Sequence, residues 1–105
     1  MSPLHYAAKK GHLSIVEYLI NQKAHINSKD KDNSTPLHYA AKKGHHSVVE
    51  YLVNQKAQIN AKNKANLTPL QYAAKKGHLS IVEYLISNKA DKNSQDNCNG
   101  FKNMI

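Results

Sequence analysis

The sequence predicts an all-α solenoid of three stacked helix-turn-helix units, each followed by an extended loop. Two observations predict this fold class. First, one phrase occurs three times, as SPLHYAAKKGH from Ser2, TPLHYAAKKGH from Thr35 and TPLQYAAKKGH from Thr68. Second, the first proline of each copy recurs with a period of 33 residues, at Pro3, Pro36 and Pro69. Such a period indicates a repeat architecture, in which each unit buries its apolar faces against its neighbours.

The period divides the chain into three repeats and a tail. We expect repeat 1 at residues 2–34, repeat 2 at 35–67, repeat 3 at 68–100, and a tail at 101–105. Repeat 3 is degenerate towards its C-terminal end. Lys92 stands there at the position that Ile26 and Ile59 occupy in the first two repeats.

Repeat 2 shows why each unit should begin with a helix. Thr35-Pro36 is typical of a helix start, because the threonine hydroxyl can accept a hydrogen bond from a free amide and proline needs no donor there. Leu37 and the pair Ala40-Ala41 then share one helix face. Gly44 should end this helix, since glycine adopts the left-handed conformation easily.

A second helix is predicted over roughly Ser47–Asn54. Its apolar face consists of Val48, Val49, Leu52 and Val53. Ser47 and Glu50 have the spacing of a capping box at its start. The rest of the repeat favours turns, because asparagine recurs there at Asn60, Asn63 and Asn66.

These motifs resemble the ankyrin repeat over residues 2–100. The resemblance is carried by T-P-L-H-x-A-A-x-x-G-H, the apolar V-V-x-x-L and the later A-x-I-N. It implies an ankyrin-repeat solenoid of antiparallel helix pairs, with hairpin loops projecting at right angles. It also implies a module that binds other proteins and has no enzymatic activity.

The sequence departs from the family at two glycine positions in each repeat. Lysine replaces the usual glycine after the second helix, at Lys23, Lys56 and Lys89, and asparagine replaces the hairpin glycine, at Asn33, Asn66 and Asn99. A lysine held in the left-handed conformation there costs about 1 kcal/mol relative to glycine.

Composition favours a soluble protein of the cytoplasm. The chain has 15 basic residues, all lysine, against 7 acidic residues, and a net charge of +8. A single cysteine, Cys98, allows no internal disulfide and suits a reducing, intracellular compartment. We expect no signal peptide, and the apolar stretches are too short to span a membrane.

The histidines and tyrosines recur by position, which is typical of structural residues. The family uses the imidazole at His5 and His38 to brace loops, and His12, His45 and His78 should lie between helices. The six tyrosines should pack, with their hydroxyls reaching water. With no catalytic constellation, no phosphate loop and one cysteine, we expect no catalytic residue, metal or cofactor.

Lysine pairs on the first helices are the candidate binding residues. In the family, their positions vary and face a concave groove, and the hairpin tips extend the same surface. The candidates are Lys9, Lys10, Lys42, Lys43, Lys75 and Lys76 on the helices, with Lys31 and Lys64 at the tips. A solvated face that keeps the chain soluble is the open alternative.

A lysine-lined groove predicts an acidic protein or peptide as the partner, because positive charge speeds encounter with acidic surfaces. Electrostatic, sequence-nonspecific binding of nucleic acid is the alternative. It is disfavoured because the chain lacks arginine, the residue that best matches phosphate and guanine.

The edges of the array lead to two further expectations. Terminal repeats usually carry a polar outer face, and repeat 1 shows no such change. Either the chain is a piece of a longer array, or its apolar edges are open for a partner or for self-association. Phe101, Met104 and Ile105 should fold over repeat 3 as a cap, unless they begin a fourth repeat.

Overall fold

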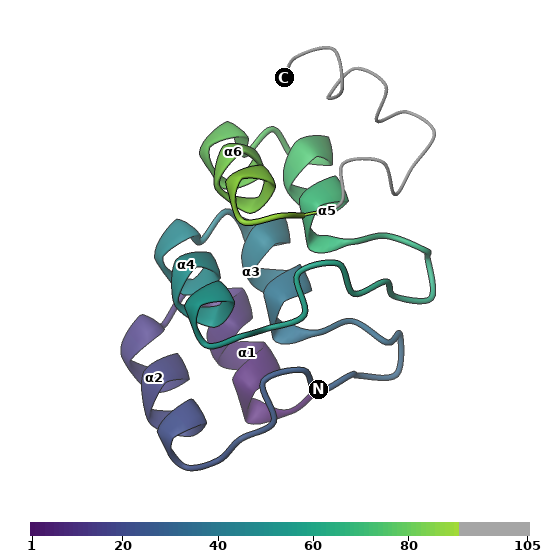
Figure 1. Ribbon diagram of the computed structural model, residues 1–105. Coiled ribbons are helices and arrows are strands. Elements are labelled where there is room, and N and C mark those ends of the chain that lie inside the picture. Colours follow the sequence, from purple (N-terminus) through teal and green to yellow (C-terminus); the bar gives the residue numbers. More distant parts are fainter. Residues whose placement is uncertain (91–105) are drawn as a thin grey trace.

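The computed structural model describes residues 1–90, which form three antiparallel helix pairs stacked in one direction (Figure 1). The helices are α1 (Pro3–Lys10), α2 (Leu13–Asn21), α3 (Pro36–Lys43), α4 (His46–Asn54), α5 (Pro69–Lys75) and α6 (Leu79–Ser87). Helices α1, α3 and α5 pack in one layer, and α2, α4 and α6 pack in a second. Long loops project from the side of the first layer, and residues 1–90 contain no strand. The predicted all-α solenoid is confirmed.

The first helix of each pair begins as the sequence predicts. The Thr35 hydroxyl accepts a hydrogen bond from the His38 amide at 3.3 Å, and the His38 Nδ1 accepts one from the Thr35 amide at 3.0 Å. This capping box recurs with Ser2 and His5, and with Thr68 and Gln71. Two donors at the helix start are thereby satisfied by side chains three residues apart.

The predicted capping box at Ser47 and Glu50 is wrong. Helix α4 begins at His46, so Ser47 already lies inside its first turn, and His45 is the N-cap residue without a side-chain cap. The reason is the tight turn at Gly44, whose φ of +82° returns the chain within two residues. His45 Nε2 instead donates to the Lys9 carbonyl of the preceding repeat, at 2.9 Å.

The second helices end in the left-handed conformation that the sequence analysis considered. Lys23, Lys56 and Lys89 have φ values of 72°, 75° and 78°. Asn33 and Asn66 are also left-handed, with φ values of 60° and 66°. At each of the three lysines the chain turns because its amide and the next one bond back to carbonyls of the last helical turn.

The core lies between the helix layers and is built from small and branched residues. Ala40 and Ala41 are fully buried, which lets neighbouring first helices approach closely. Leu37 and Leu70 anchor the same positions of successive repeats, each 1% exposed. The predicted cap of Phe101, Met104 and Ile105 lies outside the described residues, as do Lys92, Cys98 and Asn99.

Candidate functional site

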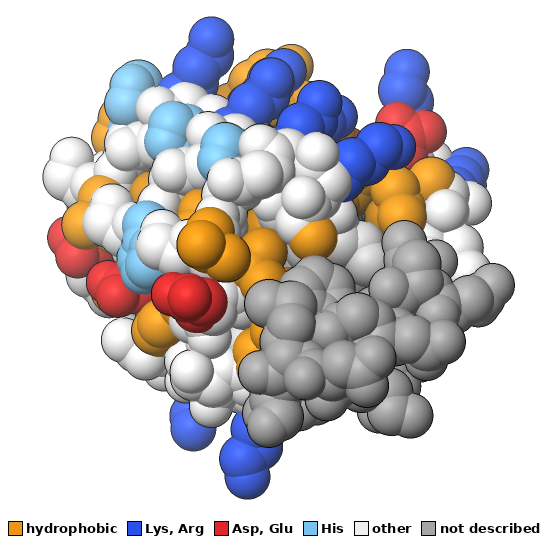
Figure 2. Space-filling view, turned by 90° about the horizontal axis from the view of Figure 1, so that it is seen from above, with side chains coloured by type: hydrophobic (Ala, Val, Ile, Leu, Met, Phe, Trp, Pro, Cys, Tyr) orange, Lys and Arg blue, Asp and Glu red, His pale blue; other side chains and the backbone are white. Residues whose placement is uncertain are grey.

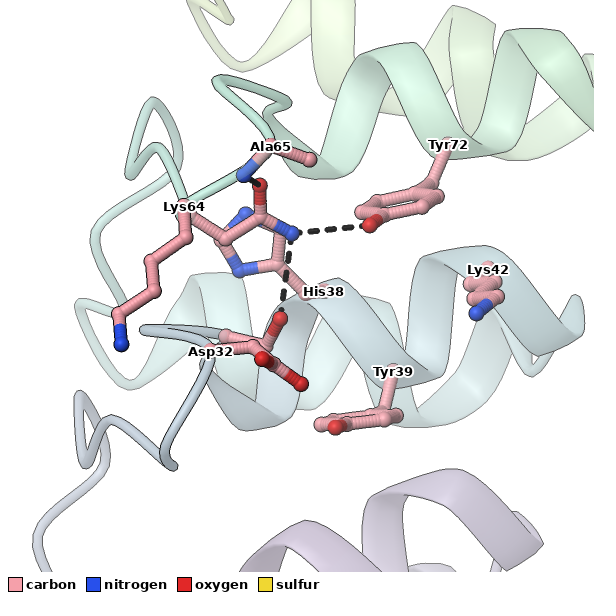
Figure 3. Close-up of a pocket in the computed structure, with 9 residues that line it drawn as sticks. Asp32, His38, Tyr39, Lys42, Lys64, Ala65 and Tyr72 are labelled. Carbon is pink, nitrogen blue, oxygen red and sulfur yellow. Dashed lines mark hydrogen bonds between the residues drawn. The ribbon is translucent and has the colours of Figure 1, made fainter.

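A hollow of about 420 Å³ lies where two successive loops approach α3 and α5 (Figure 3). We call it the central hollow. It is lined by Asp32, Ser34, His38, Tyr39, Lys42, Asn63, Lys64, Ala65 and Tyr72. Its walls therefore combine lysine, tyrosine and loop residues from all three repeats.

Two tyrosines of this hollow are tied to the loops. The Tyr39 hydroxyl donates to the Asp30 carboxylate, and the Tyr72 hydroxyl accepts from Asn63 Nδ2 at 2.8 Å. Both hydroxyls thus have a partner in a loop, because each loop brings a short polar side chain to the ring. In repeat 1, by contrast, Tyr6 and Tyr18 are 53% and 62% exposed, so the predicted packing role is wrong for them.

Asp30 and Asn63 close the two loops in the same way. The Asp30 Oδ1 accepts from the amides of Asp32 and Ser34 at 2.9 and 3.0 Å. The Asn63 Oδ1 accepts from the amides two and four residues further on, at 3.0 and 3.1 Å. A carboxylate and an amide thus perform the same structural task in successive repeats.

Backbone and side-chain bonds also join the two loops to each other. The Lys64 amide donates to the Asp32 carbonyl at 2.9 Å, and Asn63 Nδ2 donates to the Ser34 hydroxyl at 3.1 Å. These bonds position the loop tips, and with them the backbone that carries Lys64, relative to α3. The hollow is therefore shaped before any ligand arrives.

The tie between Asp30 and Tyr39 shifts the pKa of both groups. Burial alone would raise the pKa of Asp30, but the bonds from the Tyr39 hydroxyl and from the amides of Ser34 and Asp32 outweigh it and lower the pKa. Burial and the bond to Asp30 raise the pKa of Tyr39 to about 12. At neutral pH the aspartate is ionised and the tyrosine is protonated.

Two of the predicted lysines, Lys42 and Lys64, line the central hollow from opposite sides, one from a helix and one from a loop tip. Lys42 is partly buried, and its Nζ lies 5.3 Å from the centre of the Tyr72 ring, a cation–π distance. The remaining candidates are not among the described residues that line the hollow. They are Lys9, which is partly buried, and Lys10, Lys31, Lys43, Lys75 and Lys76, which are exposed.

Tyr39 and Tyr72 also line the hollow, although they were not among the predicted binding residues. The signal that could have found them is spacing, because Tyr39 stands three residues before Lys42 and Tyr72 three residues before Lys75. Residues three apart share one face of a helix. The contribution of Asp32 had no such signal, because it depends on how the loop folds back.

Charge is segregated between the two helix layers. The first helices, α1, α3 and α5, carry lysines and no acidic residue. The second helices carry no lysine, and each carries one glutamate, at Glu17, Glu50 and Glu83. Figure 2 shows many lysine side chains along the upper edge of the view and others at the lower edge, whereas acidic side chains lie mainly at the left. The loops and first helices therefore form the basic side.

The repeated histidines are structural within residues 1–90. His5 Nε2 and His38 Nε2 bond to the carbonyls of Ser34 and Leu67, each at 2.8 Å, which confirms that they brace the loops. Burial lowers the pKa of His38, so its ring is neutral and Nε2–H is the donor. The described part of the chain holds no group of three potential metal ligands, and none of its helices has the length and apolarity to cross a membrane.

Comparison with known proteins places these features in a family. Residues 4–96 match a family model described as ankyrin repeats, in three copies. The match covers most of the chain and confirms the resemblance drawn from the repeated phrase. A search of curated proteins found no match.

Proposed function

Because the chain belongs to the ankyrin-repeat family, whose members generally act in protein–protein interaction, we propose that it is a non-enzymatic module that binds an acidic segment of a partner protein. The binding surface in this proposal is the central hollow together with the lysine pairs of the first helices. The observation that carries it is that Lys42 and Lys64 line one hollow whose loops are already bonded to each other.

The charges of this surface suit an acidic ligand in two ways. The exposed lysines raise the rate at which an acidic partner is encountered. Lys42 adds directional contact, because its ammonium is held over the Tyr72 ring and its stem is partly buried. A carboxylate placed at the hollow can therefore meet positive charge from both a helix and a loop.

Asp32 adds selectivity to the same hollow. Its carboxylate would repel an acidic side chain placed beside the loop tip, whereas Lys42 attracts one on the helix side. The expected ligand is therefore an extended segment with acidic side chains towards α3 and a neutral or basic one near Asp32. Repulsion at one position is a common source of specificity.

Nucleic-acid binding has weaker support at this surface. Bases stack on free aromatic faces in single-strand binders, but the Tyr72 face is occupied by Lys42 and its hydroxyl is bonded to Asn63. The chain also lacks arginine. The positive charge alone would still attract phosphate, so a direct competition is needed.

Competition between two probes tests the proposal. A fluorescein-labelled peptide of alternating glutamate and serine is bound to the full chain, and mixed-sequence single-stranded DNA is added as competitor. We expect the acidic peptide to bind and an otherwise identical glutamine–serine peptide to bind far less. Tight DNA binding that displaces the peptide irrespective of base sequence would support the nucleic-acid function instead.

A further inference from the structure

The outer faces of the two end repeats carry the two halves of an interface that already forms twice inside the chain. The lower face is the side of repeat 1 that points away from repeat 2, with Pro3, Tyr6, His12, Ile15 and Tyr18. The upper face is the side of repeat 3 that points away from repeat 2, with Ala74, Lys75, Gly77, Leu79 and Val82.

Burial shows that the lower face is an unused packing surface. Ile15 is 46% exposed, whereas its counterparts Val48 and Ile81 are 0% and 1% exposed. Tyr6 and Tyr18 are also exposed in repeat 1, while the tyrosines at the same positions of repeats 2 and 3 are partly buried. The same residue types are therefore covered wherever a preceding repeat exists.

The upper face is open in the complementary way. A Cβ atom added at Gly11 or Gly44 would collide with the histidine ring of the next repeat, whereas none of the described atoms lies within 4 Å of one added at Gly77. Leu79 is 61% exposed, and it borders a small apolar hollow of about 170 Å³. Figure 2 looks down on this end of the stack and shows hydrophobic side chains there.

Within the described part of the chain, a hydrogen bond that links successive repeats has an unused donor in repeat 1 and an unused acceptor position in repeat 3. His45 Nε2 bonds to the Lys9 carbonyl at 2.9 Å, and His78 Nε2 bonds to the Lys42 carbonyl at 3.1 Å. Among residues 1–90 the His12 ring has no hydrogen-bond partner. The Lys75 carbonyl occupies the matching place on the upper face. The donor and the acceptor of a third such bond thus stand at opposite ends of the molecule.

We propose that a second copy of this chain stacks its lower face on the upper face of the first and so continues the solenoid. The fit follows from identity of residues, because His12, Ile15 and Tyr18 repeat the His78, Ile81 and Tyr84 of repeat 3 that already pack on repeat 2. The contact joins two different faces, so it leaves one face free on each copy. It builds rows of copies rather than a closed dimer.

End-to-end stacking and peptide binding in the central hollow should depend on salt in opposite ways. Each copy has a net charge of +8, so two copies repel one another over the range that salt screens. Added sodium chloride should therefore strengthen end-to-end stacking. The same salt should weaken binding of an acidic peptide, so the two proposals stand or fall separately.

Sedimentation velocity of the full chain tests the stacking. Over a rising concentration series we expect the average mass to pass from that of a monomer to beyond that of a dimer. Ile15→Glu blocks the lower face and Leu79→Glu blocks the upper face, and each variant alone should remain monomeric. Both side chains are largely exposed, so neither change should impair folding of the monomer. Gln58→Glu, an equal change of charge at an exposed position of repeat 2, should associate like the unchanged chain.

Mixing the two blocked variants gives the sharpest outcome. One intact upper face meets one intact lower face, so the mixture should form a one-to-one dimer and nothing larger. A full chain that stays monomeric up to millimolar concentration overturns the proposal, as does a single blocked variant that still dimerises. Loss of thermal stability in a monomeric Leu79→Glu chain also overturns it, because another part of the same chain would then cover the upper face.

Discussion

The imidazole of His45 lies over Gly11, so close that a methyl group added to this glycine would stand 2.5 Å from the ring nitrogen Nδ1. Gly11 belongs to the turn of repeat 1, whereas His45 belongs to that of repeat 2. Gly77 has the same left-handed backbone, with φ of +78° against +76°, and no described atom near its Cα hydrogen. An alanine at either glycine would have a strained backbone, but only an alanine at Gly11 would also collide with the next repeat.

Gly11→Ala should destabilise the chain more than Gly77→Ala. Both changes place alanine in the left-handed region, at about 1 kcal/mol each. Only the first also displaces the His45 ring and its bond to the Lys9 carbonyl, which adds about 1–3 kcal/mol. Urea unfolding followed by circular dichroism measures the difference. Equal losses in the two variants would mean that the ring moves aside freely.

Lys56→Gly should raise the free energy of unfolding by about 0.5–1 kcal/mol. Lys56 ends α4 with φ of +75°, a conformation that glycine adopts without strain. Part of the gain is offset, because glycine also loosens the unfolded chain. Lys62→Gly is the control, since Lys62 is exposed but has no left-handed backbone, and it should not stabilise. An unchanged urea midpoint for Lys56→Gly would contradict the prediction that the left-handed backbone of Lys56 destabilises the fold.

Asp30→Asn should reduce the fall in the free energy of unfolding that occurs as the pH is lowered. The pKa of Asp30 is lowered below the ordinary 3.8, so its carboxylate stabilises the fold above that pH, and this contribution is lost as pH falls through the lowered pKa. Asn63 shows that an amide can close the same loop, so the variant should fold. Urea midpoints measured between neutral and acid pH give the slope. Identical slopes in the two proteins would contradict the prediction.

The raised pKa of Tyr39 predicts an alkaline effect of the opposite sign. A phenol whose pKa moves from 10.0 to about 12 stabilises the fold while it is protonated. This contribution is complete below pH 10 and is lost as pH rises towards 12. Tyr39→Phe should remove that part of the alkaline dependence, and urea midpoints in the alkaline range measure it. Tyr6→Phe, at an exposed ring, is the control.

Lys42→Glu combined with Lys64→Glu should weaken binding of the glutamate–serine peptide by about tenfold or more. Exposed ion pairs contribute roughly 0.2–1 kcal/mol each, and the reversal replaces attraction by repulsion at two positions of the hollow. Fluorescence anisotropy at fixed salt measures the affinity.

Lys29→Glu combined with Lys62→Glu is the matched control for this experiment. It changes the net charge equally at exposed loop positions outside the lining of the central hollow. We expect this control to retain most of the affinity. Equal losses in the two double variants would assign the binding to overall charge rather than to the hollow. Thermal unfolding of both variants checks that the fold is kept.

The repeat period, the helix starts and the left-handed turns could be predicted from the sequence because each depends on residues only a few positions apart. Thr35 and His38 form their capping box within one turn, and Gly44 ends α3 in the left-handed conformation. The left-handed lysines could be anticipated only through the family resemblance, because they stand where the family usually has glycine. Three near-copies then repeat the same local structure, so the solenoid follows from the apolar faces that each copy must bury.

The assembly of the surface depends on contacts between repeats and could not be predicted from the sequence. The start of α4 depends on how the Gly44 turn seats His45 against repeat 1, and Ser47 was therefore misread as a cap. Tyr39 bonds to Asp30, 9 positions away, and Lys42 and Lys64, 22 positions apart, line the same hollow, both through the folding of a loop. The stack is predictable from the residues alone, because its contacts are local and repeated. The hollow, its charges and the two open faces were decided by distances between repeats, which no single repeat specifies.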